Sequence, residues 1–262
     1  MKFVVLTIFP ELMDAFWANG IMRRAIQSEA ISAEAINIRD HAAGRHRVTD
    51  DRPYGGGCGM VMKPEPLAEA ARRAKQRAPE AATILLSPQG KRFDQALARQ
   101  LAELPGMILV CGRYEGVDER FSEQFVDMEI SIGDYVMTGG EVAAMAVMDA
   151  VTRLRPGVLG NEVSAEQDSF EGHLLDNVHY TRPPEFEGRQ VPEVLLSGHH
   201  DQIARWRCAD ALLRTLARRP DLLREGSLSD EEMALLSAWH REIEGIIREQ
   251  SGGSPDSSPG GG

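Results

Sequence analysis

Cysteine is scarce in this chain, and the cysteine residues are far apart in the sequence. The 262 residues include only Cys58, Cys111 and Cys208, with no C-x-x-C pair, and no H-E-x-x-H occurs among the seven histidines. Structural zinc sites need closely spaced Cys and His ligands. We therefore expect no such metal site, and three separated cysteines favour a reducing, cytoplasmic location.

The common nucleotide-binding fingerprints are also missing. No G-x-G-x-x-G follows a strand-like segment, since residues 54–60 read YGGGCGM, and Gly90-Lys91 is followed by Arg92, where a P-loop needs Ser or Thr. No apolar run approaches the length of a membrane span, and the apolar start is too short for a secretory signal. We expect no membrane partner.

Positive charge is in deficit, with 29 Lys and Arg against 40 Asp and Glu, a net charge of −11. This balance argues against nonspecific affinity for nucleic acid. Residues 203–224 are the exception, with six arginines against two aspartates. Helical spacing predicts a stripe that either binds phosphate or is simply solvated. The stripe comprises Arg207, Arg214 and Arg218, and the residues expected on the core side are Leu212, Leu213 and Leu216.

Three short apolar runs each end in a glycine-bearing turn. Residues 83–87 precede Pro88-Gln89-Gly90, residues 107–111 precede GRYEG, and residues 129–132 precede GDYVMTGG. Such runs are typical of strands. If the strands are parallel neighbours, their loops meet at one sheet edge and form one pocket in which backbone groups bind a small polar ligand. Ordinary strand-to-helix turns are the alternative.

The order of elements predicts an α/β domain followed by a helical one. We expect residues 1–160 to form a ligand-binding domain, 161–169 a flexible linker, 170–250 a mostly helical domain and 251–262 a disordered tail. A helix should open at Glu141 and end before Arg155-Pro156-Gly157, and a capping box from Ser229 to Glu232 should start another. The expected strands are residues 2–8, 33–38, 83–87, 107–111 and 129–132.

Eight segments in sequence order form a distinctive set, and the resemblance that they carry extends over roughly residues 1 to 225. They read PYGGGCGMVMKPEPL, LLSPQGKRFDQ, LVCGRYEGVDER, SIGDYVMTGGE, RPGVLGNEVSAEQDSF, LLDNVHYTRPPEFEG, VPEVLLSGHH and IARWR. This set resembles the motifs of the bacterial tRNA (guanine-N1)-methyltransferases. The resemblance implies S-adenosylmethionine as methyl donor, tRNA as partner, the guanosine immediately 3′ of the anticodon as acceptor, and a homodimer. It also implies a parallel-sheet α/β domain with the deep trefoil knot of the SPOUT class and a small helical C-terminal domain; general chain topology would not predict a knot.

The resemblance also implies a set of donor-binding residues, most of them acting through the backbone. Leu85 and Ala143 depart from the family pattern, in which an aromatic residue and a proline are common, so the local pocket shape is in question. The donor-binding set is Leu86, Ser87, Pro88, Gly112, Tyr114, Glu115, Ile132, Gly133, Asp134, Tyr135, Val136, Met137, Gly139 and Gly140.

Three residues are candidates for catalysis. Guanine N1 carries a proton and attacks poorly until that proton leaves, so a general base is needed. Asp168 matches the family's catalytic aspartate, although a solvated linker acid is the alternative. Arg153 would stabilise the negative charge that develops on O6, or else only bind carbonyls at its helix end. Glu115 would bind the guanine edge, help hold a magnesium ion if the reaction needs one, or complement a helix N-terminus.

Two further segments are candidates for RNA contact. His199 and His200 would bind or stack on splayed bases, or simply start the arginine-bearing helix. Residues 54–59 would lie near the substrate, or form a plain hairpin or Ω loop. Two other functions stay open: a related knotted methyltransferase acting on another base or ribose position, and a noncatalytic RNA-binding module.

Overall fold

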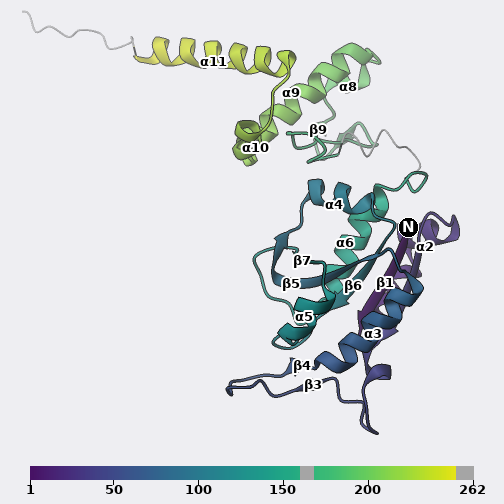
Figure 1. The fold of residues 1–262 in the computed structure, drawn as a ribbon. Helices are drawn as coiled ribbons and strands as arrows, with labels where there is room; N and C mark the ends of the chain where they lie inside the picture. The colour runs from purple at the N-terminus through teal and green to yellow at the C-terminus, as the bar shows by residue number, and fades with distance from the viewer. Residues whose placement is uncertain (160–167, 252–262) are drawn as a thin grey trace, which may run out of the picture. The chain divides into compact units, whose positions relative to one another are not determined.

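The computed structural model describes residues 1–159 and 168–251 (Figure 1). The chain divides into two compact units, with the boundary between residues 166 and 167. The predicted linker, residues 161–169, lies mostly outside the described residues, and so does nearly all of the predicted tail, residues 251–262.

The first unit is built on a parallel sheet of five strands in the order β2-β1-β6-β5-β7. The last three are the strands expected to be neighbours, and they are parallel, with Leu86 paired to both Cys111 and Ile130. A separate antiparallel pair, β3 and β4, precedes the first long helix. The strands are β1 Lys2–Thr7, β2 Ser32–Asn37, β3 Asp50–Asp51, β4 Val61–Met62, β5 Ala82–Arg92, β6 Gly106–Cys111 and β7 Met128–Ser131.

Strand β5 is longer than the sequence predicts. The expected end at residue 87 is wrong, because the chain bulges and then pairs with β7 again through Lys91 and Arg92. Both Leu86 and Lys91 lie opposite Ile130, so the intervening residues protrude from the ladder. Gly90 permits the close return, since a Cβ there would lie 2.4 Å from the backbone carbon of Glu129.

Both faces of this sheet are covered by helices (Figure 1). Along β1, Phe3 and Val5 pack into one core cluster with α1, α2, α4 and α6, while Val4 and Leu6 pack into the other with α3 and α5. Burial on both faces explains why these strands read as continuous apolar runs. The helices are α1 Pro10–Trp17, α2 Gly20–Gln27, α3 Pro64–Arg77, α4 Gln95–Ala102, α5 Glu119–Phe125 and α6 Glu141–Arg153, with the 3₁₀ helix η1 at Ile38–His41. The predicted start and end of α6 are confirmed.

The second unit is mostly helical in its described part. The predicted capping box is confirmed: the Ser229 backbone N–H donates to the Glu232 carboxylate (2.7 Å), and the Glu232 N–H donates to the Ser229 hydroxyl (3.3 Å). None of the helices in residues 1–159 and 168–251 is long and apolar enough to cross a membrane. The elements are β8 Glu185–Phe186, β9 Arg189–Gln190, α8 Glu193–Leu196, α9 His200–Arg218, α10 Pro220–Glu225 and α11 Asp230–Ser251.

The expected core face of α9 is partly wrong. Leu212 is buried, but Leu213 and Leu216 are 53% and 45% exposed. The buried face instead contains Ala211 and Thr215, because small side chains let the segment that precedes β8 pack closely on this helix. The leucine pattern therefore predicts a face about a quarter-turn from its true position.

Candidate active site

The three expected loops line one cavity at the carboxyl edge of the sheet, with a volume of about 380 Å³. We call residues 87–90 the first cavity loop, 112–116 the second and 133–140 the third. The volume falls in the range of small-molecule sites, and the position is usual for α/β folds. Asp134 is not among the lining residues. The predicted residues that line the cavity are Leu86, Ser87, Pro88, Gly112, Tyr114, Glu115, Ile132, Gly133, Tyr135, Val136, Met137, Gly139 and Gly140.

The second and third cavity loops approach each other at backbone distance. The Gly140 N–H donates to the Gly112 carbonyl (2.9 Å), and Arg113 forms an isolated antiparallel bridge with Gly139. A Cβ at Gly140 would lie 2.8 Å from Cα of Cys111. Glycine is therefore required at residue 140 for close approach, since its φ of −80° is open to any residue.

A buried ion pair fixes these two loops, and the sequence did not predict it. Glu141 is 1% exposed, and its carboxylate lies 2.9 Å from Nη2 of Arg113. The Thr7 hydroxyl at the end of β1 donates to the same carboxylate (2.7 Å), and the Arg113 guanidinium lies over the Phe9 ring at 4.5 Å. A lone glutamate in an otherwise Ala-, Val- and Met-rich helix was the available signal, because a buried charge needs a partner.

Cys111 lies at the end of β6, against the same group of charges. Burial raises the pKa of its thiol well above the ordinary value; the Glu141 carboxylate adds to the rise and Arg113 opposes it. The thiol is therefore protonated and uncharged at neutral pH, which suits a fully buried side chain below the cavity.

Glu115 is exposed on the second cavity loop and contacts the hairpin that joins β3 to β4. Its N–H donates to the Met60 carbonyl (3.0 Å), and a Cβ at Gly59 would collide with its carboxylate at 2.2 Å. Residues 54–59 thus lie in a hairpin whose Gly59, with φ of +88°, makes room for Glu115. Asp118, not Glu115, caps the N-terminus of α5, because the Asp118 side chain accepts the Arg120 N–H.

Arg153 does not join the cavity within one chain. It is the exposed last residue of α6, whereas Gly140, which lines the cavity, immediately precedes the first residue of that helix. A helix of this length separates its ends by about 18 Å, more than an arginine side chain can span. Arg153 therefore does not reach the cavity of its own chain.

Asp168 is the first described residue of the second unit. Its carbonyl accepts the Glu171 N–H (3.2 Å), which starts a compact loop over residues 168–178. Glu166 and Gln167, the polar neighbours that suggested a linker, lie outside the described residues.

The expected RNA-contact residues lie along α9. His199 is the N-cap of this helix and His200 is its first residue, as expected if the pair starts the arginine-bearing helix. Both side chains are exposed. Arg207 and Arg218 are exposed and Arg214 is half-buried. Arg207 also lines a second cavity of about 610 Å³, between α9 and residues 177–196.

Residues 1–159 and 168–251 contain no group of three or more His, Cys, Asp or Glu side chains that could hold a metal ion. Glu115 therefore belongs to no such preformed cluster in the described part of the chain. The three cysteines are free.

A doubly covered parallel sheet with a cavity at its carboxyl edge, lined largely by loop residues, defines the first unit as a ligand-binding α/β domain. Comparison with known proteins narrows this class. A family model described as tRNA (guanine-1)-methyltransferase TrmD matches residues 1–225.

Relatives from several bacteria agree with that match. The chain is 56% identical over 256 residues to the tRNA (guanine-N(1)-)-methyltransferase of Desulfatibacillum aliphaticivorans, covering 98% of each chain. It is 53% identical over 240 residues to that of Hahella chejuensis, covering 91% of this chain and 93% of the relative. The crystal structure of tRNA (m1G37) methyltransferase from Aquifex aeolicus matches with a TM-score of 0.70 and 39% identity, over 86% of this chain and 95% of that one.

The chain therefore belongs to the tRNA (guanine-N1)-methyltransferase family. It is an enzyme that transfers a methyl group to N1 of guanine in tRNA. This decides against the two alternatives from the sequence, a noncatalytic RNA-binding module and a methyltransferase for another base or ribose position.

Proposed function

We propose that the methyl donor is S-adenosylmethionine and that the cavity formed by the three cavity loops binds it. The cavity fits in size, and its walls combine backbone polar groups with the apolar side chains of Leu86, Ile132 and Met137. Such walls suit a ligand with both an adenine ring and polar groups. When bound, the donor supplies an electrophilic methyl group on a sulfonium.

The acceptor in this proposal is the guanosine immediately 3′ of the tRNA anticodon, methylated in the cytoplasm. The solved enzyme from Aquifex aeolicus is a tRNA (m1G37) methyltransferase, and the identity of 39% over nearly all of that chain supports the same position here.

Asp168 serves as the general base and removes the proton from guanine N1. Deprotonation leaves negative charge on O6, and the Arg153 guanidinium stabilises that charge more in the transition state than in the ground state. Glu115, exposed on the second cavity loop beside the hairpin, binds the guanine edge.

A homodimer completes the site in this proposal. Arg153 is a helix length from the cavity of its own chain, so a second copy must supply the arginine that faces the bound guanine. Exposed apolar side chains at the cavity support a covering partner: Tyr114 is 51% exposed, Tyr135 55% and Val136 89%.

We also propose the trefoil knot of the SPOUT class for the first unit. Strand β7 lies at the sheet edge beyond β5, yet Gly140 contacts Cys111 and Gly112 at the end of β6. Residues 132–139 must therefore cross the end of β5, where the first cavity loop protrudes. This crossing of residues 132–139 over the end of β5 supports a chain path that passes through a loop, as a knot requires.

The helical unit binds tRNA in this proposal, through exposed cations along α9. His199, His200, Arg207 and Arg218 are exposed on one helix and its N-cap, while half-buried Arg214 contributes less.

The convergence of all three cavity loops on one cavity carries the proposal, and one assay tests it. Labelled S-adenosylmethionine is incubated with tRNA transcripts that carry guanosine or adenosine beside the anticodon, and the methylated position is mapped by mass spectrometry. We expect methylation of the guanosine transcript only. Asp168→Asn should lower the single-turnover rate about 100- to 10,000-fold and leave donor affinity nearly unchanged. A wild-type rate would remove Asp168 from the mechanism.

A further inference from the structure

The loop that begins with the proposed base is tied to the helices of its own unit. We call residues 168–178 the anchored loop. The Leu175 N–H donates to the Thr215 hydroxyl of α9 (2.8 Å), and the Val178 N–H donates to the Asp210 carboxylate of the same helix (2.8 Å). Arg219, just before α10, lies over the Phe170 ring at 5.8 Å. These contacts hold the loop at its start and its end.

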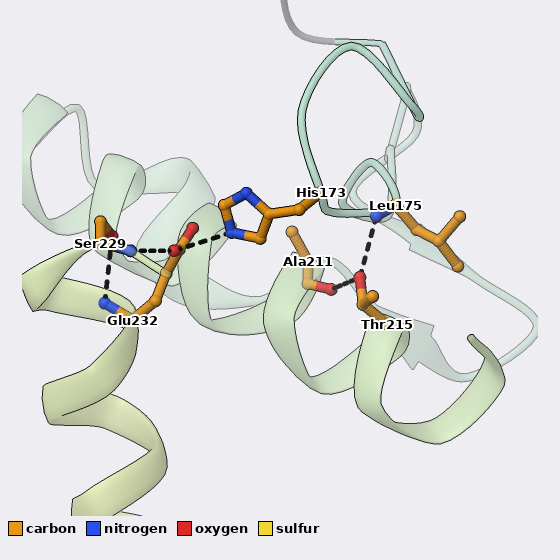
Figure 2. A network of polar contacts seen from close by, with 6 residues as sticks. All are labelled: His173, Leu175, Ala211, Thr215, Ser229 and Glu232. Carbon is orange, nitrogen blue, oxygen red and sulfur yellow. Dashed lines mark hydrogen bonds and ion pairs between the residues drawn. The ribbon is translucent and has the colours of Figure 1, made fainter. Parts of the chain in front are cut away.

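His173 supplies the contact with α11, at the middle of the anchored loop. Its Nε2 lies 2.9 Å from Oε2 of Glu232 (Figure 2). The imidazole is accommodated by Gly226, where a Cβ would lie 2.2 Å from Cβ of His173. Any residue larger than glycine at position 226 would therefore displace His173.

Glu232 is itself held in place. Its side chain is 9% exposed, and the same Oε2 also accepts the Ser229 N–H at the start of α11 (Figure 2). Burial disfavours the charged form, but hydrogen bonds from Ser229 and His173 outweigh it and lower the pKa of Glu232. The carboxylate is ionised at neutral pH and offers His173 a fixed, charged acceptor.

The anchored loop is also closed on itself. The Glu171 N–H donates to the Asp168 carbonyl (3.2 Å), the Phe170 N–H to the Leu174 carbonyl (3.3 Å), and the Asp176 N–H to the Ser169 hydroxyl (2.9 Å). Hydrogen bonds within the loop thus connect Asp168 to the residues that contact the helices. Its backbone position follows from that of α9 and α11.

We propose that the helical unit carries Asp168, and that His173 and Glu232 are positioning residues for this base. The inference rests on the proposed role of Asp168 and goes beyond it, since neither partner of this pair touches donor or guanine in the proposed mechanism. The base then moves as part of the unit that binds tRNA, so docking of tRNA on α9 also sets where the base is presented.

The test is single-turnover methylation by the full-length enzyme with saturating S-adenosylmethionine and tRNA transcript. His173→Ala should lower the rate about 10-fold, because small misplacements of a catalytic group are costly while the contacts of Leu175 and Val178 remain. Donor and tRNA dissociation constants should stay within about two-fold, since no binding residue is changed. Glu232→Gln, which keeps an acceptor for both partners, should retain most of the rate.

His240→Ala is the matched control. His240 pairs with Glu244 at 3.3 Å on the exposed face of α11, so this change also breaks a His–Glu contact but leaves the anchored loop untouched. We expect a wild-type rate for it.

A double-mutant comparison separates positioning from general destabilisation. If His173 acts through Asp168, His173→Ala should cost little further rate in an Asp168→Asn background. An equal loss in both backgrounds, or no loss in the wild-type background, overturns the inference. Failure of Asp168→Asn itself to slow the reaction would instead reject the proposed base. If His173→Ala does not fold, Glu232→Ala, which removes the acceptor, gives the same comparison, and His173→Gln, which keeps a donor, should retain most of the rate.

Discussion

Replacing Arg113 by alanine tests whether the buried ion pair holds the cavity together. Glu141 is 1% exposed in the native protein, and after the change the Thr7 hydroxyl still donates to its carboxylate but no cation from the second cavity loop faces it. Removing one partner of a buried pair leaves an uncompensated charge and typically costs about 3 to 5 kcal/mol. We expect Arg113→Ala to lower the free energy of unfolding by about this amount.

The same variant should weaken donor binding. The backbone bridge between Arg113 and Gly139 survives this change, but the Arg113 side chain, which fills the space beside that glycine, is lost. Without it, the second and third cavity loops lose this side-chain connection, and the bond from the Gly140 N–H to the Gly112 carbonyl must hold them at this point. Donor affinity should fall about 10-fold or more, because looser loops must be ordered on binding.

Denaturant unfolding and titration calorimetry with S-adenosylmethionine measure both effects. Arg120→Ala is the control, since the Arg120 side chain is 64% exposed and its pair with Asp118 should contribute less than about 1 kcal/mol. Adding Glu141→Gln to Arg113→Ala removes the stranded charge and should restore part of the lost stability. A loss below about 1 kcal/mol for Arg113→Ala, with no recovery in the double variant, would show that the ion pair does not hold these loops.

Two further changes probe the cavity and the proposed role of Arg153 in catalysis. Gly140→Ala should destabilise the first unit by about 1 to 3 kcal/mol by denaturant unfolding, because its Cβ would press on Cα of Cys111; Gly112→Ala, whose Cβ would meet only Val117 at 3.7 Å, should be near neutral. Arg153→Ala should slow single-turnover methylation much more than it weakens donor binding, since its partner charge develops mainly in the transition state. An equal loss of donor affinity would indicate a structural role for Arg153.

The strands of the first unit were predictable because local signals specify them. Buried parallel strands read as apolar runs, and glycine-bearing turns mark their ends, so the expected and observed bounds of β1, β2, β6 and β7 differ by at most one residue at either end. The capping box of α11 is equally local, since Ser229 and Glu232 are three residues apart. The convergence of the three cavity loops then followed from the geometry of parallel strands.

The features that the sequence did not predict depend on contacts between residues far apart in the chain. Arg113 and Glu141 are 28 residues apart, and His173 and Glu232 are 59 apart. Nothing near Leu86 signals that β5 will return to the ladder, because the return depends on space left by the backbone of β7. Leu213 and Leu216 were misplaced for the same reason: the packing partner of α9 decides which face is buried.

In the proposed mechanism the two units have different duties in methyl transfer, and the contacts inside each unit match this division. The second and third cavity loops are joined by a buried ion pair and by a glycine that permits close backbone contact, so the proposed donor would meet a preformed wall. The proposed base belongs to the anchored loop of the other unit, where hydrogen bonds from Leu175 and Val178 and the His173–Glu232 pair fix its backbone. The walls of the cavity and the backbone at Asp168 are therefore each held by contacts within their own unit. Mutations that break the contacts of one unit should alter either donor affinity or the chemical step, but not both.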